Sequence, residues 1–190
     1  PWRFFQGTVR ARTTTETYAK DSFENLLFSI CRFREVTGGY PRQITIVSFT
    51  YKQTRFEHIH APTLHWPKDR FVFLGVDPPS KTGFRLEEAS KREQEHGTKP
   101  FLEDPYSCNS ALLLLREKPR RQRDPFFRKP PYEMTCPEMK ELLEWCGPDL
   151  FPKDKLPWNY QEEPIPPIEN QTKSESLTNR SKEEINPTQK

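Results

Sequence analysis

The sequence predicts an α/β protein with a doubly wound parallel sheet, and three observations lead to that fold class. Segments rich in β-branched and aromatic residues alternate with segments of helical periodicity, in the order strand, helix, strand, helix, strand. The connections between them are short, as expected where helices cross from one parallel strand to the next. The segment 43–49 is almost entirely β-branched or aromatic, which is typical of a strand buried on both faces. We therefore expect three layers, with helices on both faces of the sheet.

The first three elements are expected between residues 8 and 49. The run 8–13 (Thr-Val-Arg-Ala-Arg-Thr) predicts a short strand. A helix at 23–36 follows, because apolar residues at 23, 26, 27, 30 and 31 recur at helical spacing. Asp21 and Glu24 form a capping box at its start, and Gly38 is placed for a left-handed cap at its end. The second strand is the segment 43–49.

The remaining elements are predicted from periodicity and from proline. A helix at 51–61 has Tyr51, Phe56 and Ile59 at helical spacing and is expected to end at Pro62. The run 70–76 predicts the third strand. Three further helices are expected at 86–94, 108–117 and 138–145, and the apolar run 111–115 predicts that the second of them packs on the sheet.

The composition divides the chain into a packed part and a tail. Of the 190 residues 33% are hydrophobic and 30% are charged, and with 20 prolines only part of the chain can form a core. All four Trp and all fourteen Phe lie within residues 1–158, whereas 161–190 has no aromatic residue. Such a composition is typical of disorder. We expect one α/β domain over 1–158 and a disordered tail over 159–190.

Charge and hydropathy exclude two classes of partner. A net charge of +3, from 30 basic and 27 acidic residues, is too balanced to indicate nucleic acid. The basic run 116–129 contains Phe126 and Phe127, but prolines interrupt it and we interpret it as a solvated loop. No apolar run approaches the roughly 20 residues that span a bilayer. The expected partners are therefore neither nucleic acid nor membrane, and the expected location is cytoplasmic.

The cysteines and histidines do not have the spacing of a metal site. The four cysteines form no CxxC pair, and we expect reduced thiols, with a Cys136–Cys146 bridge as the alternative. His58 and His60 point to different faces of the predicted helix, and Pro62 separates them from His65. No metal site is predicted.

The candidate site consists of polar side chains where predicted strands lead into helices, since ligands of open α/β sheets bind beyond the carboxyl ends of the strands. Hydroxyls, carboxylates, an amide and two cations at these turns can hold a polar or anionic molecule. The alternative interpretation is that they only cap helices and face solvent. The nine residues are Glu16, Asp21, Ser22, Glu24, Asn25, Ser48, Tyr51, Lys52 and Arg55.

These same segments resemble the YdcF-like, SanA/ElyC-type family, domain of unknown function 218, in its fungal branch. One family pattern has Glu, then Ser, Asn, Thr, Glu and Asn, where this chain has Glu16, Ala19, Asp21, Ser22, Glu24 and Asn25. The other is Val-Thr-Ser-x-Tyr-His-x-x-Arg, where this chain has Val47, Ser48, Phe49, Tyr51, Lys52 and Arg55. The resemblance covers about residues 8–158.

The resemblance implies a Rossmann-like fold with a polar pocket at the strand ends, and S-adenosylmethionine as a possible cofactor. The family's opening strand and glycine pair have no counterpart here, so we expect a sheet that is incomplete at its N-terminal side. Two functions follow. One is the binding of a small polar or anionic molecule, such as a nucleotide, with or without hydrolase or transferase chemistry. The other is a non-catalytic interaction or scaffold protein with a degenerate α/β domain.

Overall fold

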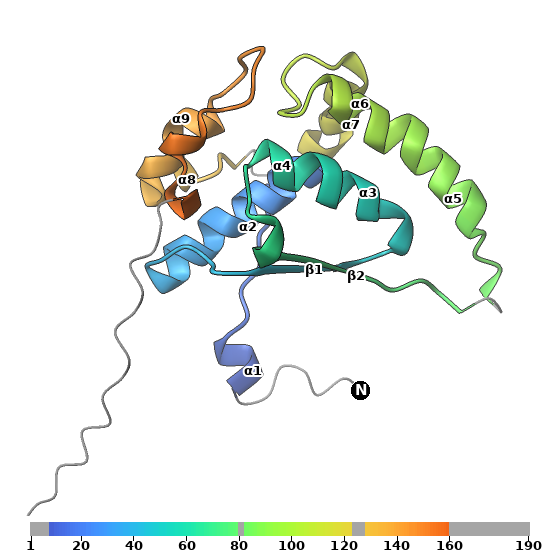
Figure 1. The fold of residues 1–190 in the computed structure, drawn as a ribbon, viewed down its shortest axis with the longest axis horizontal. Helices are drawn as coiled ribbons and strands as arrows, with labels where there is room; N and C mark the ends of the chain where they lie inside the picture. The colour runs from blue at the N-terminus through green and yellow to red at the C-terminus, as the bar shows by residue number, and fades with distance from the viewer. Residues whose placement is uncertain (1–7, 80–81, 123–127, 160–190) are drawn as a thin grey trace, which may run out of the picture.

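The computed structural model describes residues 8–79, 82–122 and 128–159. In this part of the chain the strands are β1 (Ile44–Ser48) and β2 (Phe71–Gly75), which pair in parallel from Ile44 with Phe71 to Ser48 with Gly75. All other elements are helical (Figure 1). The protein is therefore α/β, and both strands confirm the predictions at 43–49 and 70–76.

Helix α2 (Ser22–Thr37) provides one side of the core and confirms the helix predicted at 23–36. The Asp21 carboxylate accepts the backbone N–H of Glu24 at 2.8 Å, and the Glu24 carboxylate accepts the N–H of Lys20 at 2.6 Å. Gly38, with φ 81°, ends the helix in the left-handed region and donates its N–H to the Arg34 carbonyl. The cap at Gly38 and the Asp21 half of the capping box confirm the prediction, whereas Glu24 binds the N–H of Lys20 instead of that of Asp21.

The crossover from β1 to β2 is a helical stretch built from four short pieces. These are η1 (Thr50–Lys52), α3 (Gln53–Arg55), the π turn η2 (Phe56–His60) and α4 (Ala61–Thr63). The predicted helix at 51–61 is confirmed, but Pro62 does not end it. Pro62 lies in the first turn of α4, where its missing N–H is tolerated, and the chain leaves the helix at Leu64.

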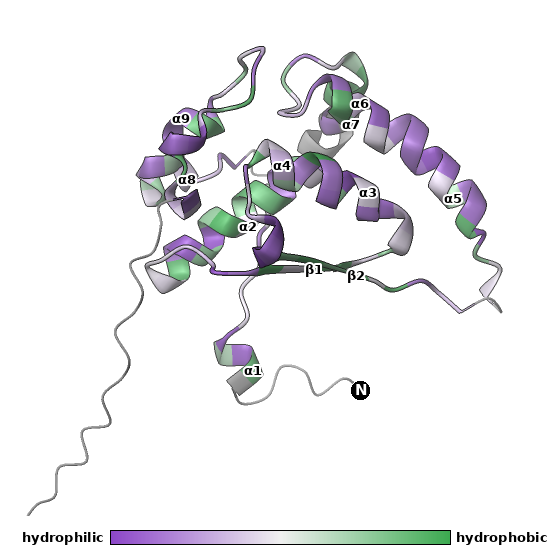
Figure 2. Cartoon of the chain, in the orientation of Figure 1, coloured by the Kyte–Doolittle hydropathy of each residue, from purple (hydrophilic) through white to green (hydrophobic). Residues whose placement is uncertain are grey.

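Among the described residues, helices cover one face of the sheet, which differs from the expected three layers. Ile44, Ile46 and Phe73 point into the core, where the helices of Figure 1 lie. The opposite face exposes 66% of Val47 and 49% of Leu74 to solvent. The prediction that 43–49 is buried on both faces is therefore wrong for the described residues, in which β1 alternates between partly buried and exposed positions. Both strands are nevertheless hydrophobic, as Figure 2 shows.

The helices after β2 enclose the other side of the core. Helix α5 (Leu86–Glu93), hydrophilic along its length in Figure 2, continues through the π turn η5 (Gln94–Thr98) into α6 (Lys99–Glu103). Helix α7 (Ala111–Gln122) begins later than predicted, because the Asp104 carboxylate accepts the N–H groups of Asn109 and Ser110, both at 2.7 Å. Shorter turns follow: α8 (Tyr132–Thr135), η6 (Pro137–Met139), α9 (Lys140–Leu143), η7 (Lys153–Lys155) and η8 (Pro157–Asn159).

Two predictions about the ends of the chain are affected. The strand expected at 8–13 is instead a single helical turn, α1 (Thr8–Ala11), and the Thr13 hydroxyl donates to the Val9 carbonyl at 2.6 Å. This run has the alternation of a strand but no partner strand, so a local hydrogen bond decides its conformation. Of the tail predicted over 159–190, residues 160–190 lie outside the described part.

The cysteines are paired differently from either prediction. Cys108, which precedes α7, forms a disulfide with Cys146, which follows α9. Cys31 and Cys136 are free and buried. The expectation of four reduced thiols is therefore wrong, as is the alternative Cys136–Cys146 bridge, because Cys136 faces Cys31 and Tyr40 in the core instead of Cys146.

Candidate functional site

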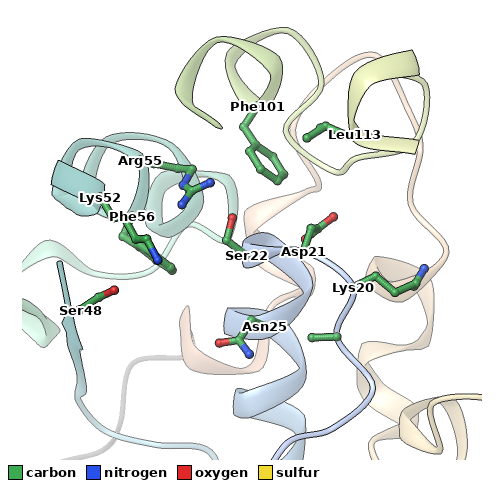
Figure 3. Close-up of a pocket in the computed structure, with 11 residues that line it drawn as sticks. Lys20, Asp21, Ser22, Asn25, Ser48, Lys52, Arg55, Phe56, Phe101 and Leu113 are labelled. Atoms are coloured by element: carbon green, nitrogen blue, oxygen red, sulfur yellow. The ribbon is translucent and has the colours of Figure 1, made fainter. Parts of the chain in front are cut away.

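The candidate site is a cavity of 370 Å³ at the N-terminus of α2, beside the carboxyl end of β1 (Figure 3). Six of the nine predicted residues line it, and five others complete its wall. The six are Asp21, Ser22, Asn25, Ser48, Lys52 and Arg55, and the five are Ala19, Lys20, Phe56, Phe101 and Leu113. The structure thus brings together residues from α2, β1 and the crossover helix, as a site at the strand ends requires.

The two cations of the crossover helix differ in environment. Lys52 has no ion pair with a carboxylate of the described residues, and its ammonium lies over the Phe49 ring, 5.3 Å from the centroid. Arg55 is buried, and its Nε lies 2.9 Å from Oε1 of Glu93 on α5. Lys52 therefore has the charge that is available to an anionic ligand, whereas the charge of Arg55 is compensated within the protein.

The α2 end of the cavity contains a buried network of charges. Lys20 forms ion pairs with Glu24 at 2.9 Å and with Glu117 at 3.1 Å. Burial lowers the pKa of Lys20, but the hydrogen bonds and charges of these two carboxylates outweigh it, so its pKa lies above the ordinary value. Burial raises the pKa of Asp21, and the hydrogen bond from the Glu24 N–H opposes that effect. The other carboxylate oxygen of Asp21 makes no hydrogen bond to a described residue.

The wall at Ser22 is supported from behind by a histidine that the sequence analysis did not include in the site. The Oγ of Ser22 lies 2.8 Å from Nε2 of His60, which is fully buried at the end of the π turn η2. Burial lowers the pKa of His60 well below 6.5, and the nearby Arg55 lowers it further. His60 is therefore a neutral ring at pH 7.

Three predicted site residues do not line the cavity. Glu16 holds the segment before α2: its carboxylate accepts the N–H groups of Tyr18 at 2.6 Å and Ala19 at 3.1 Å. Glu24 is engaged with Lys20, whose backbone N–H and ammonium its carboxylate binds. Tyr51 stacks on Phe49, with the ring centroids 5.4 Å apart. All three contacts are consistent with the structural alternative to binding.

The apolar part of the wall was missed by sequence analysis. Phe101 lies in α6 and Leu113 in α7, so both reach the cavity from segments far along the chain from the polar ones. No local pattern marks them, because their role depends on how α6 and α7 fold back over α2. Phe56, in contrast, follows Arg55 directly and was already placed on the apolar face of the crossover helix.

No metal site emerges from the described residues, where no three His, Cys, Asp or Glu side chains gather closely enough to hold an ion. His65 is engaged elsewhere, with Nε2 2.8 Å from the Phe151 carbonyl oxygen. The described part of the chain also has no helix of the length and apolar character needed to cross a membrane.

Comparisons with known proteins give one relative and no assigned function. The chain is 32% identical to the uncharacterized protein YOR238W of Saccharomyces cerevisiae over 170 residues. That alignment covers 82% of this chain and 53% of the yeast protein, so the chain spans about half the length of its relative. No family model matches the sequence. No solved structure matches it either.

Proposed function

We propose that the cavity between α2, β1 and the crossover helix binds a small anionic or polar molecule, such as a nucleotide. The observation that supports this most is the convergence of Ser22, Asn25, Ser48 and Lys52 on one cavity of 370 Å³. This volume lies within the range of small-molecule sites. Its wall has seven polar or charged side chains and four apolar ones, so it is more polar than most such sites and suits a polar ligand. Membership of the YdcF-like family and S-adenosylmethionine as cofactor are parts of the same proposal that rest on the sequence resemblance.

Lys52 is the residue on which the experiment should be built. Arg55 is the other cation of the wall, but the Arg55–Glu93 pair makes its replacement a structural change. Lys52→Met keeps most of the apolar stem and removes the charge, together with the contact of the ammonium with the Phe49 ring. The matched control is Lys68→Met, because Lys68 is an exposed lysine at the other end of the crossover, outside the cavity.

Thermal unfolding in the presence of nucleotides, sugar phosphates and S-adenosylmethionine is the measurement. A ligand at 100 times its dissociation constant stabilises the native state by about 2.7 kcal/mol, which is readily seen. The proposal expects at least one anionic compound to raise the melting temperature of the wild type and of Lys68→Met, but not of Lys52→Met. A shift that survives in Lys52→Met, or no shift with any compound, would contradict it.

The second candidate function is an interaction or scaffold role, and the bare face of the sheet favours it. Val47, Leu74 and Val76 expose 66%, 49% and 59% of their surface on or next to that face. Parallel sheets are normally covered on both faces, so we propose that a further layer packs here and completes a Rossmann-like, three-layer arrangement. A partner protein covering the same face would instead make this part of the chain a scaffold.

Two lysine substitutions test whether that face is covered. Val47→Lys and Leu74→Lys place a charge on the bare face without touching the core side of the strands. A covered face predicts a loss of about 2 kcal/mol or more in the free energy of unfolding for each variant. Changes within about 0.5 kcal/mol, as for ordinary surface positions, would show that no layer of the chain itself covers the face and would leave a partner protein as the candidate.

A cytoplasmic location is also part of the proposal. The Cys108–Cys146 disulfide argues against it, because disulfides are rare in reducing compartments. Alkylation of the thiols during rapid cell lysis, followed by mass spectrometry, distinguishes a reducing from an oxidising location. Reduced Cys108 and Cys146 would support the cytoplasm, and a bridged pair would exclude it as the main location.

A further inference from the structure

Ser22 and His60 form a hydrogen-bonded pair in which only Ser22 reaches the cavity. The Oγ of Ser22 and the Nε2 of His60 are 2.8 Å apart, and Ser22 lines the wall while His60 does not. In Figure 3 the Ser22 side chain rises from the first turn of α2 into the space below Arg55. A serine bonded to a histidine at a cavity wall can serve either as a nucleophile or as a binding group, and the surroundings of His60 decide between the two.

His60 is enclosed by aromatic rings, and no carboxylate of the described residues contributes to the shift of its pKa. Its ring centroid lies 4.6 Å from that of Phe101, 5.2 Å from that of Phe56 and 5.8 Å from that of Phe23. The charged group that acts on it is the guanidinium of Arg55, which disfavours a second positive charge. A general base must hold the proton it takes, and its pKa should lie near the working pH. His60 meets neither condition, so it cannot activate Ser22 as a nucleophile.

The second nitrogen of the ring indicates where the single proton of neutral His60 resides. Nδ1 is buried and has no hydrogen-bond partner among the described residues. A proton on Nδ1 would leave a buried N–H without an acceptor, which folded proteins avoid more strictly than an unused acceptor. The proton therefore belongs on Nε2, where it is donated to Ser22 Oγ. The hydroxyl oxygen then accepts from His60, and its own hydrogen is left for the cavity.

We propose that His60 positions Ser22 as a hydrogen-bond donor to an anionic oxygen, a phosphate or carboxylate oxygen of the ligand, beside the ammonium of Lys52. This assignment rests on the proposed function and narrows its ligand to an oxyanion. Ser22 is the binding residue and His60 the positioning residue.

Binding of inorganic phosphate, glucose 6-phosphate and succinate, each measured by calorimetry, tests the assignment and separates phosphate from carboxylate. Hydrogen bonds to charged groups are strong enough that Ser22→Ala should weaken binding of the preferred oxyanion about 10-fold or more. Ser22→Thr keeps the hydroxyl and should bind within about threefold of wild type. Wild-type affinity in Ser22→Ala would overturn the assignment.

The position of the proton on the His60 ring tests the assignment directly, because a histidine with only a structural role could carry its proton on either nitrogen. Long-range proton–nitrogen spectra of the full chain should show Nε2 protonated and Nδ1 bare between pH 8 and pH 6. His60→Gln, which places an amide N–H near the same point, should bind the oxyanion more tightly than His60→Leu. Protonation on Nδ1 would overturn the assignment, as would labelling of Ser22 by a fluorophosphonate probe for activated serines.

Failure of the proposed function has a different signature. If the wild type binds none of the three oxyanions, the assignment to Ser22 and His60 fails, whereas the proposed function fails only if no nucleotide, sugar phosphate or S-adenosylmethionine binds either. If Lys52→Met loses binding while Ser22→Ala retains it, the cavity still binds an anion, and only the role of Ser22 and His60 is refuted.

Discussion

Arg55 Nε and Glu93 Oε1 lie 2.9 Å apart, and each side chain is only 11% exposed. The pair joins the crossover helix to α5, two elements that no sheet hydrogen bond connects. The guanidinium also lies over the Phe101 ring, 5.9 Å from its centroid. If Arg55 were a solvent-facing cation, as one interpretation of the sequence expects, its replacement would change stability by no more than about 1 kcal/mol. Its burial shows that this expectation is wrong.

Arg55→Ala should lower the free energy of unfolding by about 3 to 5 kcal/mol, because it leaves the Glu93 carboxylate buried without its partner. Urea denaturation followed by circular dichroism measures the effect. The double variant Arg55→Met, Glu93→Leu removes both charges and should recover most of the loss. A single variant as stable as the wild type would mean that the pair contributes nothing to folding.

Gly97→Ala should disturb the same pair from a different element. A Cβ at position 97 would come within 2.7 Å of Glu93 Oε1 and 2.9 Å of Arg55 Nη1, so both side chains would have to move. We expect a loss of about 1 to 3 kcal/mol in the free energy of unfolding. Gly39→Ala is the matched control, since a Cβ there meets nothing within 4 Å. Equal stability of the two alanine variants would refute the prediction.

Stability should fall below pH 6.5 because of His60. Its folded-state pKa lies well below 6.5 as a result of burial, whereas the unfolded chain takes up the proton near 6.5. The contribution is therefore complete above pH 6.5 and is lost as the pH falls, by about 1.4 kcal/mol per pH unit for one proton. Urea denaturation between pH 7.5 and 5 measures the slope, and His60→Gln should flatten it. An unchanged slope in that variant would assign the pH dependence to other groups.

The titration of Asp21 and Glu24 cannot be mistaken for that of His60, because it changes the free energy of unfolding in the opposite direction. Burial raises the pKa of each carboxyl above its ordinary value, so the folded state takes up these protons before the unfolded chain does. Their ionisation therefore lowers stability, and their effect has the opposite sign to that of His60, with stability rising as the pH falls toward 4.

The four cysteines should fall into two classes. Reduction of Cys108–Cys146, which closes a loop of 38 residues, should lower the free energy of unfolding by about 4 kcal/mol on the chain-entropy model. Cys31 and Cys136 have no exposed surface and should react with iodoacetamide only on unfolding. Mass spectrometry of alkylated samples with and without reductant measures both effects. Fast labelling of Cys31 in the native protein would contradict the structure.

Local sequence signals predicted the local structure of α2 and of the crossover well. The hydrogen bonds of the caps at Asp21 and Gly38 join residues only a few positions apart, so their formation depends little on the rest of the fold. The polar wall of the cavity was predictable for the same reason, because strand ends and helix starts can be read from short windows. Six of the nine predicted residues do line it.

What depended on distant segments was not predictable. Arg55 has the sequence context of a surface residue. It is buried in an ion pair because the fold places Glu93, 38 positions later in the chain, beside it. The Cys108–Cys146 bridge equally depends on how α7 and α9 meet. The strand expected at 8–13 failed because alternation shows which side chains could share a face, but not whether a partner strand is present.

The two π turns have a consequence for changes in chain length. Each holds one residue more per turn than an α-helix would, so the side chains beyond it are rotated by about 100° relative to a regular helix. One π turn ends at His60 and the other contains Gly97, which lies against the Arg55–Glu93 pair. Removing a single residue from Gln94–Thr98 would leave a regular helix between α5 and α6, yet it would turn Phe101 away from the cavity. The length of the chain at these two turns, as much as the identity of any side chain, therefore determines what the cavity presents to a ligand.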